Sequence, residues 1–258
     1  MTSNIDTSVP HSARTWNYWL GGKDNYPVDQ EAGDAYAEIA PQVVTMARES
    51  RRYLIRAVAL LAGELGVRQF LDIGTGLPTY GNTHEVAQKI TPDAKIVYVD
   101  NDPIVLAHAA ALLYSTPEGV TAYIDSDLHD PEKILRRAAA TLDFNRPIAL
   151  MLMGILGHIK EYAEATAIVR HLLASLPSGS YLVHYDGTNT DADLMKAQAG
   201  YDDTGAVPYV LRSPEQIRAY YQGLELLEPG IVSCPLWRPD SGTSPEPTYI
   251  YGGVGRKP

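Results

Sequence analysis

The sequence predicts an α/β fold with a mostly parallel sheet, a C-terminal antiparallel hairpin and an N-terminal helical extension. Three observations lead to this prediction. Apolar runs typical of buried strands alternate with helical segments between residues 69 and 185. Two later strand-like runs, GIVSCPLW and TYIYGGVG, are joined by a loop rich in Pro, Ser and Gly, as in a hairpin. The residues before the first predicted strand lack this alternation of strands and helices. We therefore divide the chain into an arm or lid, residues 1–62, and an α/β domain, residues 63–258.

The arm concentrates aromatic side chains in a short polar stretch, HSARTWNYWLGGKDNYPVDQEAGDAYAEIAP. Trp16, Tyr18, Trp19 and Tyr26 in such a stretch should cover apolar surface. The segment is therefore expected to dock on the sheet as a helical arm, to form a lid over a bound ligand, or to do both.

Residues 43–61 predict an amphipathic helix, because apolar side chains recur at helical spacing. The opposite face carries four arginines, Arg48, Arg51, Arg52 and Arg56. A solvated helix face is the simpler interpretation of this cluster, and a functional one is the alternative. The whole chain has 21 Lys and Arg against 31 Asp and Glu, a net charge of −10, which repels phosphate backbones. We therefore expect no nucleic-acid partner.

The α/β domain is predicted to begin with a strand at 69–73, followed by strands at 95–99, 120–124, 147–153 and 180–185. A helix with one apolar face is predicted at about 161–175. Three further helix starts can be read at Asp102-Pro103, Asp130-Pro131 and Ser213-Pro214. Each places an N-cap side chain before a proline, whose missing N–H costs nothing in the first helical turn.

Composition also limits the class of protein. No stretch is long and free enough of charge to span a bilayer, and residues 1–14 lack the profile of a secretory signal. We expect a cytoplasmic protein with no membrane partner. The single cysteine, Cys234, excludes an internal disulfide, and no close His, Asp and Glu set has the spacing of a metal site, so no metal is expected.

The most informative segment is FLDIGTGLPT at 70–79, an apolar strand that ends in Asp72 and leads into a Gly74-Thr75-Gly76 turn. Glycines allow a ligand to lie against the backbone. Asp100 closes the next apolar run, KIVYVD, where a carboxylate can accept hydrogen bonds from both hydroxyls of a ribose. The pair predicts a nucleoside site, although a lone Gly-x-Gly is also compatible with a simple tight turn.

The surroundings of this turn favour one nucleoside. A dinucleotide fingerprint needs a third glycine at the position of Thr79, and residues 69–83 contain no Lys or Arg to attract a pyrophosphate. Asp72, Asp100 and Asp102 flank the turn instead. S-adenosylmethionine lacks phosphate and carries a positive sulfonium, so acidic strand ends attract it. We favour it over a nicotinamide cofactor.

Five runs together resemble a bacterial family of S-adenosylmethionine-dependent methyltransferases whose substrates are largely uncharacterised: PHSARTWNYWLGGKDNYPVDQEA, FLDIGTGLPT, VYVDNDP, DLHDP and YIYGGVGRKP. The resemblance spans nearly the whole chain. The LGGKDNYPVD segment is specific to that family, whereas the Gly-x-Gly loop is shared by class I methyltransferases generally. The resemblance implies a Rossmann-like class I methyltransferase fold with S-adenosyl-L-methionine as cofactor.

Carried over by position, the resemblance implies roles at the first two strand ends. The Gly74-Thr75-Gly76 turn matches the first methyltransferase motif, where the backbone lies along the amino-acid portion of the donor. Asp72 would bind the donor ammonium directly or through water. Asp100 matches the acidic residue that holds the ribose, with Asn101 beside the adenine.

The resemblance also implies roles at the next two strand ends. Asp127 and Leu128 match the residues that read the adenine, with Asp125 as a competing candidate for the carboxylate. Met153 ends the fourth strand, where the methyl acceptor usually lies. Many amine methyltransferases carry Asn-Pro-Pro-Tyr at this place, but this chain has MLMGILGHI. The departure argues against amide or adenine-amino methylation and leaves the acceptor open.

Methyl transfer mainly needs alignment and exclusion of water, although a hydroxyl or ammonium acceptor also needs a base. His158 and His184 are candidates because each follows an apolar strand run, and Tyr18 and Tyr185 are lesser ones. A hydrogen-bonded structural role is the alternative for each of them. The catalytic residue is therefore left unassigned.

We expect a methyltransferase acting on a small-molecule acceptor, with Arg14, Lys23 and Asn25 of the arm closing over the donor and contacting its carboxylate. A non-catalytic protein that binds and senses S-adenosylmethionine is the main alternative, because the sequence predicts the nucleoside site but does not identify an acceptor site. An NAD(P)-dependent oxidoreductase is less favoured.

Overall fold

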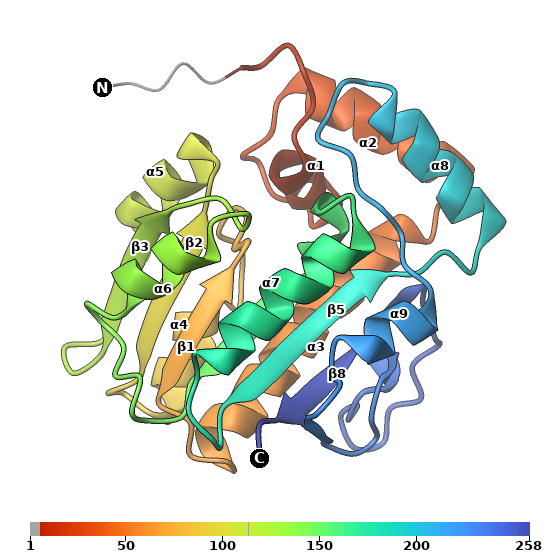
Figure 1. Cartoon of the computed structure of the whole chain (residues 1–258). Helices are drawn as coiled ribbons and strands as arrows, with labels where there is room; N and C mark the ends of the chain where they lie inside the picture. The colour runs from red at the N-terminus through yellow and green to blue at the C-terminus, as the bar shows by residue number, and fades with distance from the viewer. Residues whose placement is uncertain (1–5, 113) are drawn as a thin grey trace.

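The computed structural model describes residues 6–112 and 114–258, whose strands form one eight-stranded mixed sheet with helices on both faces (Figure 1). Residues 1–5, the start of the predicted arm and of the segment compared with a secretory signal, lie outside this description. The strands are β1 (Gln69–Ile73), β2 (Lys95–Asp100), β3 (Val120–Asp125), β4 (Ala149–Met153), β5 (Tyr181–Gly187), β6 (Glu225–Leu226), β7 (Val232–Ser233) and β8 (Ile250–Arg256).

The helices occupy the segments between and before these strands. They are α1 (Ser12–Trp19), α2 (Pro27–Ile39), α3 (Val43–Gly63), α4 (Thr83–Ile90), α5 (Pro103–Leu112), α6 (Pro131–Ala138), α7 (Tyr162–Ala174), α8 (Ala192–Asp202) and α9 (Pro214–Ala219), with 3-10 turns η1 (Leu156–His158) and η2 (Cys234–Leu236). No helix among the described residues is long and apolar enough to cross a membrane.

The strand order is β3-β2-β1-β4-β5-β8-β6, and β7 also pairs with β8. β1 pairs in parallel with β2 and β4, β2 with β3, and β4 with β5, which confirms the mostly parallel sheet. Because these strands are parallel, their carboxyl ends meet at one edge of the sheet. The candidate site residues predicted at the ends of these parallel strands therefore lie at the same edge of the sheet.

Both faces of the sheet are buried, which explains the uninterrupted apolar runs of its strands. Phe70 and Met151 belong to a cluster shared with α3 and α4, whereas Leu71 and Leu150 belong to one shared with α6 and α7. Successive residues thus alternate between two cores, as the pleat of a strand requires.

The three predicted helix starts are confirmed at α5, α6 and α9. In each, the capping oxygen accepts a hydrogen bond from a backbone N–H of the first turn: Asp102 from Ile104 at 2.8 Å, Asp130 from Lys133 at 3.0 Å, and Ser213 from Gln216 at 3.2 Å.

The C-terminal hairpin is confirmed, but its two strands are unequal. β7 pairs with β8 only at Val232 and Ser233, after which the chain enters η2, where Pro235 has no N–H to extend a ladder. β8 runs antiparallel to β5 over its whole length and lies between β5 and β6. The hairpin therefore enters the sheet rather than only lengthening its edge.

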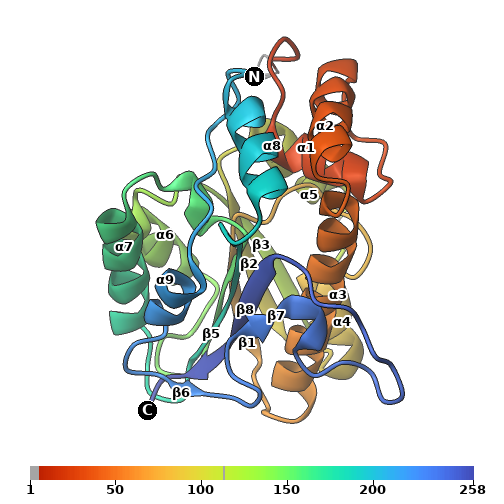
Figure 2. The same ribbon diagram turned by 90° about the vertical axis from the view of Figure 1, so that its right-hand side faces the viewer.

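The first two helices lie over the carboxyl edge of the sheet, and α2 lies beside α8 in both views (Figures 1 and 2). An aromatic series joins them, since Trp19 packs edge-on against Tyr36 at 5.2 Å and Tyr36 against Tyr201 of α8 at 6.3 Å. We call α1, α2 and α8 the roof. The aromatic residues of the arm thus cover apolar surface, as their number predicts.

Candidate functional site

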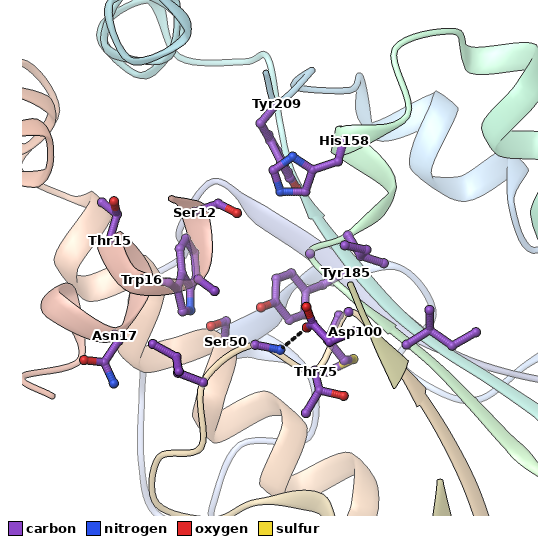
Figure 3. A pocket seen from close by; sticks show the side chains of 18 of the residues that line it. Ser12, Thr15, Trp16, Asn17, Ser50, Thr75, Asp100, His158, Tyr185 and Tyr209 are labelled. Carbon is purple, nitrogen blue, oxygen red and sulfur yellow. Dashed lines mark hydrogen bonds between the residues drawn. The ribbon is translucent and has the colours of Figure 1, made fainter. Parts of the chain in front are cut away.

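A cavity of about 290 Å³ lies between the roof and the carboxyl edge of the sheet. We call its lower part, at the ends of β1, β2 and β3, the sheet half; its lining includes Asp72, Gly74, Thr75, Gly76, Asp100, Asn101, Asp127 and Leu128. We call the part beneath the roof the roof half; its lining includes Trp16, Trp19, His158, Tyr185, Tyr201, Tyr209 and Leu211. Figure 3 shows side chains of both halves around one space.

The glycine turn gives the sheet half its bare backbone. Gly74 and Gly76 have φ values of 75° and 66°, in the region that side chains rarely adopt. A Cβ on Gly74 would collide with Ile155, so this glycine is needed for packing. Nothing lies within 4 Å of where a Cβ on Gly76 would stand. A ligand can therefore approach the backbone at Gly76.

Asp100 stands next to this turn. Its Oδ2 accepts the Gly76 N–H at 2.9 Å and its Oδ1 accepts the Asp102 N–H at 2.9 Å. Burial raises the pKa of Asp100, and these two hydrogen bonds oppose the shift. The carboxylate is thus held at the end of β2 with its orientation fixed.

Asp72 lies deeper in the sheet half, with 4% of its surface exposed. Its Oδ2 accepts a hydrogen bond from the Thr83 hydroxyl at 2.7 Å. Burial raises the pKa of Asp72 to about 6, while Thr83 and the cation of Arg51 oppose the shift. A cation bound beside Asp72 would therefore stabilise the ionised form of this carboxyl group.

Asn101 and Asp127 form a pair at the ends of β2 and β3, where the Asn101 amide donates to Asp127 Oδ2 at 2.7 Å. Burial favours neutral Asp127, but hydrogen bonds from His129 and Asn101 together hold its pKa below the ordinary value. Asp127 and Leu128 line the cavity, whereas Asp125 is not among the residues described as lining it. Of the two competing carboxylates, the geometry favours Asp127.

Arg51 is a cavity residue that sequence reasoning missed. It is the one Arg or Lys among the described lining residues, and within residues 6–112 and 114–258 it forms no ion pair with a carboxylate. The other three arginines of the cluster have different surroundings. Arg48 is exposed, and Arg52 pairs with Glu49. Arg56 donates hydrogen bonds to two carbonyl groups at the η2 turn. A helical pattern alone does not reveal which turn of α3 faces the cavity.

His158 follows β4 on η1 and lines the roof half, together with Met153 at the end of that strand. Its Nδ1 lies 3.0 Å from the carbonyl oxygen of Pro208. A carbonyl only accepts, so Nδ1 carries the proton and the Nε2 lone pair is available in the neutral ring. Burial lowers the pKa of His158, and the ring packs edge-on against Tyr209 at 5.1 Å. His158 is therefore a neutral base at neutral pH.

Tyr209 and Asp186 were not predicted, and they explain the position of His184. The Tyr209 hydroxyl donates to Asp186 Oδ1 at 2.7 Å, and His184 Nε2 bonds Asp186 Oδ2 at 2.9 Å. His184 is fully buried against Tyr220 in the core and does not line the cavity, which corrects its expected placement. Alternation along β5 turns Tyr185, not His184, toward the cavity.

Tyr185 stands at the centre of the close view, between the arm and the strand ends (Figure 3). Burial raises the pKa of Tyr185 to about 12, which keeps the phenol neutral. It therefore offers an aromatic face and a hydroxyl rather than a base.

Four arm residues predicted at the site lie elsewhere. The Tyr18 hydroxyl donates to a carboxylate of α2 at 2.7 Å, and the buried Arg14 pairs with Asp29 at 3.1 Å. Lys23 is exposed, and the Asn25 amide donates within the arm at 2.9 Å. Tyr18, Arg14 and Asn25 thus bond within the arm, and none of the four residues is among those described as lining the cavity, where their predicted roles would place them.

The opposite face of α1 meets the cavity instead. Ser12, Thr15, Trp16 and Trp19 recur at helical spacing and line it. Figure 3 places Ser12 and Trp16 across the cavity from His158 and Tyr209. The arm therefore covers the site through its aromatic face.

Comparisons with known proteins show which family and which solved structures the chain is similar to. A family model described as S-adenosyl methyltransferase matches residues 1–258. A DUF574 family protein from Streptomyces avermitilis is 46% identical, with a TM-score of 0.94 over 99% of this chain and 100% of its own. A Thermobifida fusca protein assigned as a methyltransferase is 38% identical, with a TM-score of 0.90 over 98% of this chain and 96% of its own.

More distant structures share the fold alone. The N-methyltransferase NodS from Bradyrhizobium japonicum, crystallised with S-adenosylhomocysteine, is 15% identical, with a TM-score of 0.51 over 89% of this chain and 97% of its own. None of the curated proteins compared with the chain matches it.

Proposed function

The chain belongs to the S-adenosyl methyltransferase family, and from this premise we propose that it moves a methyl group to a small molecule bound in the roof half. S-adenosylmethionine is the donor. It supplies a methyl group on a positively charged sulfur, already activated for displacement. The protein has to bind it, align the acceptor and exclude water.

The main observation that supports our position for the donor is that the backbone of Gly76 has open space above it and is hydrogen-bonded to the Asp100 carboxylate. Asp100 suits the ribose hydroxyls, and the Asn101–Asp127 pair with Leu128 suits the adenine. The donor also carries one ammonium and one carboxylate at its amino-acid end. Asp72 and Arg51 both line the cavity and offer the complementary charges, and Arg51 is near enough to Asp72 to lower the pKa of that carboxyl. The residues present therefore fit this donor.

We further propose that residues 1–62 act as the arm or lid over the site and residues 63–258 as the Rossmann-like methyltransferase domain. The aromatic face of α1 supports this division, because Trp16 and Trp19 line the roof half. Closing an apolar surface over the reacting atoms excludes water.

A sensor that binds the donor without turnover is the second candidate. The observation that favours an enzyme over it is His158, whose neutral ring presents Nε2 toward the space where an acceptor would lie. Release of S-adenosylhomocysteine separates the two, because a sensor would bind the donor and release none.

The experiment combines calorimetry with two matched variants. Wild-type protein is titrated with S-adenosylmethionine and with NAD, and Asp100→Asn is compared with Asp125→Asn, a carboxylate in register with it but outside the described lining. We expect donor affinity to fall by about 1–3 kcal/mol in Asp100→Asn only, from loss of hydrogen bonds to a charged acceptor. Preference for NAD, or equal losses in both variants, would contradict the proposal.

A further inference from the structure

The roof half has a different charge from the sheet half. All carboxylates of the described lining, Asp72, Asp100 and Asp127, belong to the sheet half. The residues described as lining the roof half include no carboxylate, and are mainly aromatic and aliphatic side chains with a few hydroxyl, amide and imidazole groups. The one cation of the described lining, Arg51, acts on Asp72 of the sheet half. A charged acceptor bound there would lose hydration without a counterion, which is costly. The lining therefore favours an uncharged, largely apolar acceptor.

The shape of the lining favours a planar acceptor. Trp16 comes from the arm, Tyr185 from β5 and Tyr209 from the segment after α8, and their rings surround one space (Figure 3). Rings packed around a space suit offset or edge contacts with another ring. An aromatic amine of the same shape is also uncharged and would fit the same rings, so it is the competing acceptor that an experiment must include.

His158 is fixed as a base in this half by several contacts from the segment 208–210. The Pro208 carbonyl orients its ring, and the Val210 N–H donates to the Gly157 carbonyl at 2.8 Å. A side chain at Gly157 would collide with the Tyr209 ring, so only glycine permits this close packing. The imidazole is thus held between η1 and Tyr209, with Nε2 left for the cavity.

A buried chain of hydrogen bonds in turn holds Tyr209. Its hydroxyl donates to Asp186, which is bonded on its other oxygen by His184, and both acidic and imidazole groups are fully buried. These two residues do not contact the cavity; they fix the ring that packs against His158. Burial is the largest influence and lowers the pKa of His158; the Pro208 carbonyl, Asp186 and Asp202 oppose this shift, and His11 adds to it.

We propose that the acceptor is an uncharged aromatic molecule bearing a hydroxyl group, and that His158 removes the hydroxyl proton as the methyl group is transferred. This inference rests on the proposed methyltransferase function. The hydroxyl oxygen forms a bond to the methyl carbon while the carbon–sulfur bond breaks, and its electron pair stays on sulfur. The proton passes to Nε2 of His158 and then to solvent. The products are a methyl ether and S-adenosylhomocysteine.

The first test uses matched probes. 7-Hydroxycoumarin and 1-naphthol are compared with 7-aminocoumarin and 1-naphthylamine. Binding to protein loaded with S-adenosylhomocysteine is followed by fluorescence, and methylated products are identified by mass spectrometry. We expect the hydroxyl probes to bind and to be methylated on oxygen, and the amino probes to remain unmethylated.

The second test replaces the base. His158→Gln should lower turnover of the hydroxyl probes by at least about 100-fold, the usual contribution of a general base. Affinity for S-adenosylhomocysteine should not change. In the wild type, kcat/KM should rise with pH as His158 loses its proton and then level off, and this limb should vanish in His158→Gln. His171→Gln, on an exposed part of α7, is the matched control.

Tyr209→Phe tests the positioning role, because it keeps the ring but removes the hydrogen bond to Asp186. We expect kcat to fall by about 10-fold, with KM nearly unchanged and the pH limb shifted, since a mobile imidazole loses alignment. Tyr114→Phe, at an exposed site, is its control.

The outcomes distinguish failure of the proposed acceptor class from failure of the proposed methyltransferase function. If amino probes are methylated and hydroxyl probes are not, or if the hydroxyl probes neither bind nor react while the donor binds, the acceptor class is wrong and the methyltransferase proposal stands. Full turnover in His158→Gln overturns the assignment of the base. If calorimetry shows no binding of S-adenosylmethionine, the proposed function itself fails.

Discussion

The two halves of the cavity are built in different ways. The sheet half is formed by residues at or just after the ends of β1, β2 and β3, where nearby groups fix the carboxylates: backbone N–H groups of Gly76 and Asp102 hold Asp100, and the Thr83 hydroxyl holds Asp72. The roof half combines α1, α3, η1, the end of β5 and the segment after α8, which lie far apart in the sequence. Local turns therefore create the donor side, and tertiary packing creates the acceptor side.

The two halves also differ in electrostatics. The sheet half concentrates three carboxylates and lies near Arg51, whereas the roof half offers mainly aromatic rings and the neutral imidazole of His158. This contrast matches the two tasks, since the donor is charged and the proposed acceptor is not. Changes in the sheet half should thus alter donor affinity, and changes in the roof half should alter turnover.

The largest effect expected in the sheet half comes from filling the space at Gly76. Gly76→Leu places a side chain where nothing lies within 4 Å and should weaken donor binding by at least about 100-fold by calorimetry. Gly66→Leu is the control, because Gly66 has a similar φ of 68° and open space but lies in an exposed loop. Equal donor affinity in the two variants would show that the turn does not contact the donor.

Asp72→Asn should change how stability depends on pH. The pKa of Asp72 is raised to about 6 in the folded protein, from 3.8, so the folded state binds this proton more tightly than the unfolded chain. Stability from the protonated form is present below about pH 4 and lost as the pH rises through about 6. The wild type should lose about 2–3 kcal/mol more of its free energy of unfolding over this range than the variant.

Urea unfolding from about pH 4 to about pH 7.5, without donor, measures this difference. Asp125→Asn, at an exposed carboxylate, should retain the wild-type pH dependence. An unchanged slope in Asp72→Asn would mean that the sheet half does not hold a destabilised carboxylate for the donor cation to stabilise.

A smaller effect distinguishes the amino-acid end of the donor from its nucleoside. Arg51→Gln should weaken S-adenosylmethionine binding by about 10-fold, through loss of one charge-assisted contact to the carboxylate. It should leave unchanged the affinity for 5′-deoxy-5′-methylthioadenosine, which lacks that carboxylate. Arg48→Gln, on an exposed turn of the same helix, is the control. Equal losses for both ligands would place Arg51 in a general structural role.

The difference between the halves also explains what the sequence could predict. β1 lies at 69–73 as predicted, and the helix caps at Asp102, Asp130 and Ser213 form as predicted, because strand periodicity and capping are local. β4 begins at Ala149 rather than at 147, where a proline lacks the N–H that a ladder requires. The candidate residues at the first three strand ends also line one cavity.

The roof half could not be predicted in this way. Arg14 was expected to contact the donor, but its partner Asp29 lies on the next helix, and only the fold reveals that ion pair. Arg51 differs from Arg48 only in which turn of α3 faces the cavity. Tyr209 lies outside helices and strands, so no periodic pattern marks it, and Asp186 acts through it. Such contacts depend on packing between distant segments.

A crystal structure of the protein with bound S-adenosylhomocysteine tests the central claim most directly. We predict that its ribose hydroxyls donate to Asp100, its adenine lies against Leu128, its carboxylate meets Arg51, and its sulfur faces the roof half. Binding of the molecule elsewhere, or in this cavity with Asp100 directed away from the ribose, would contradict the account.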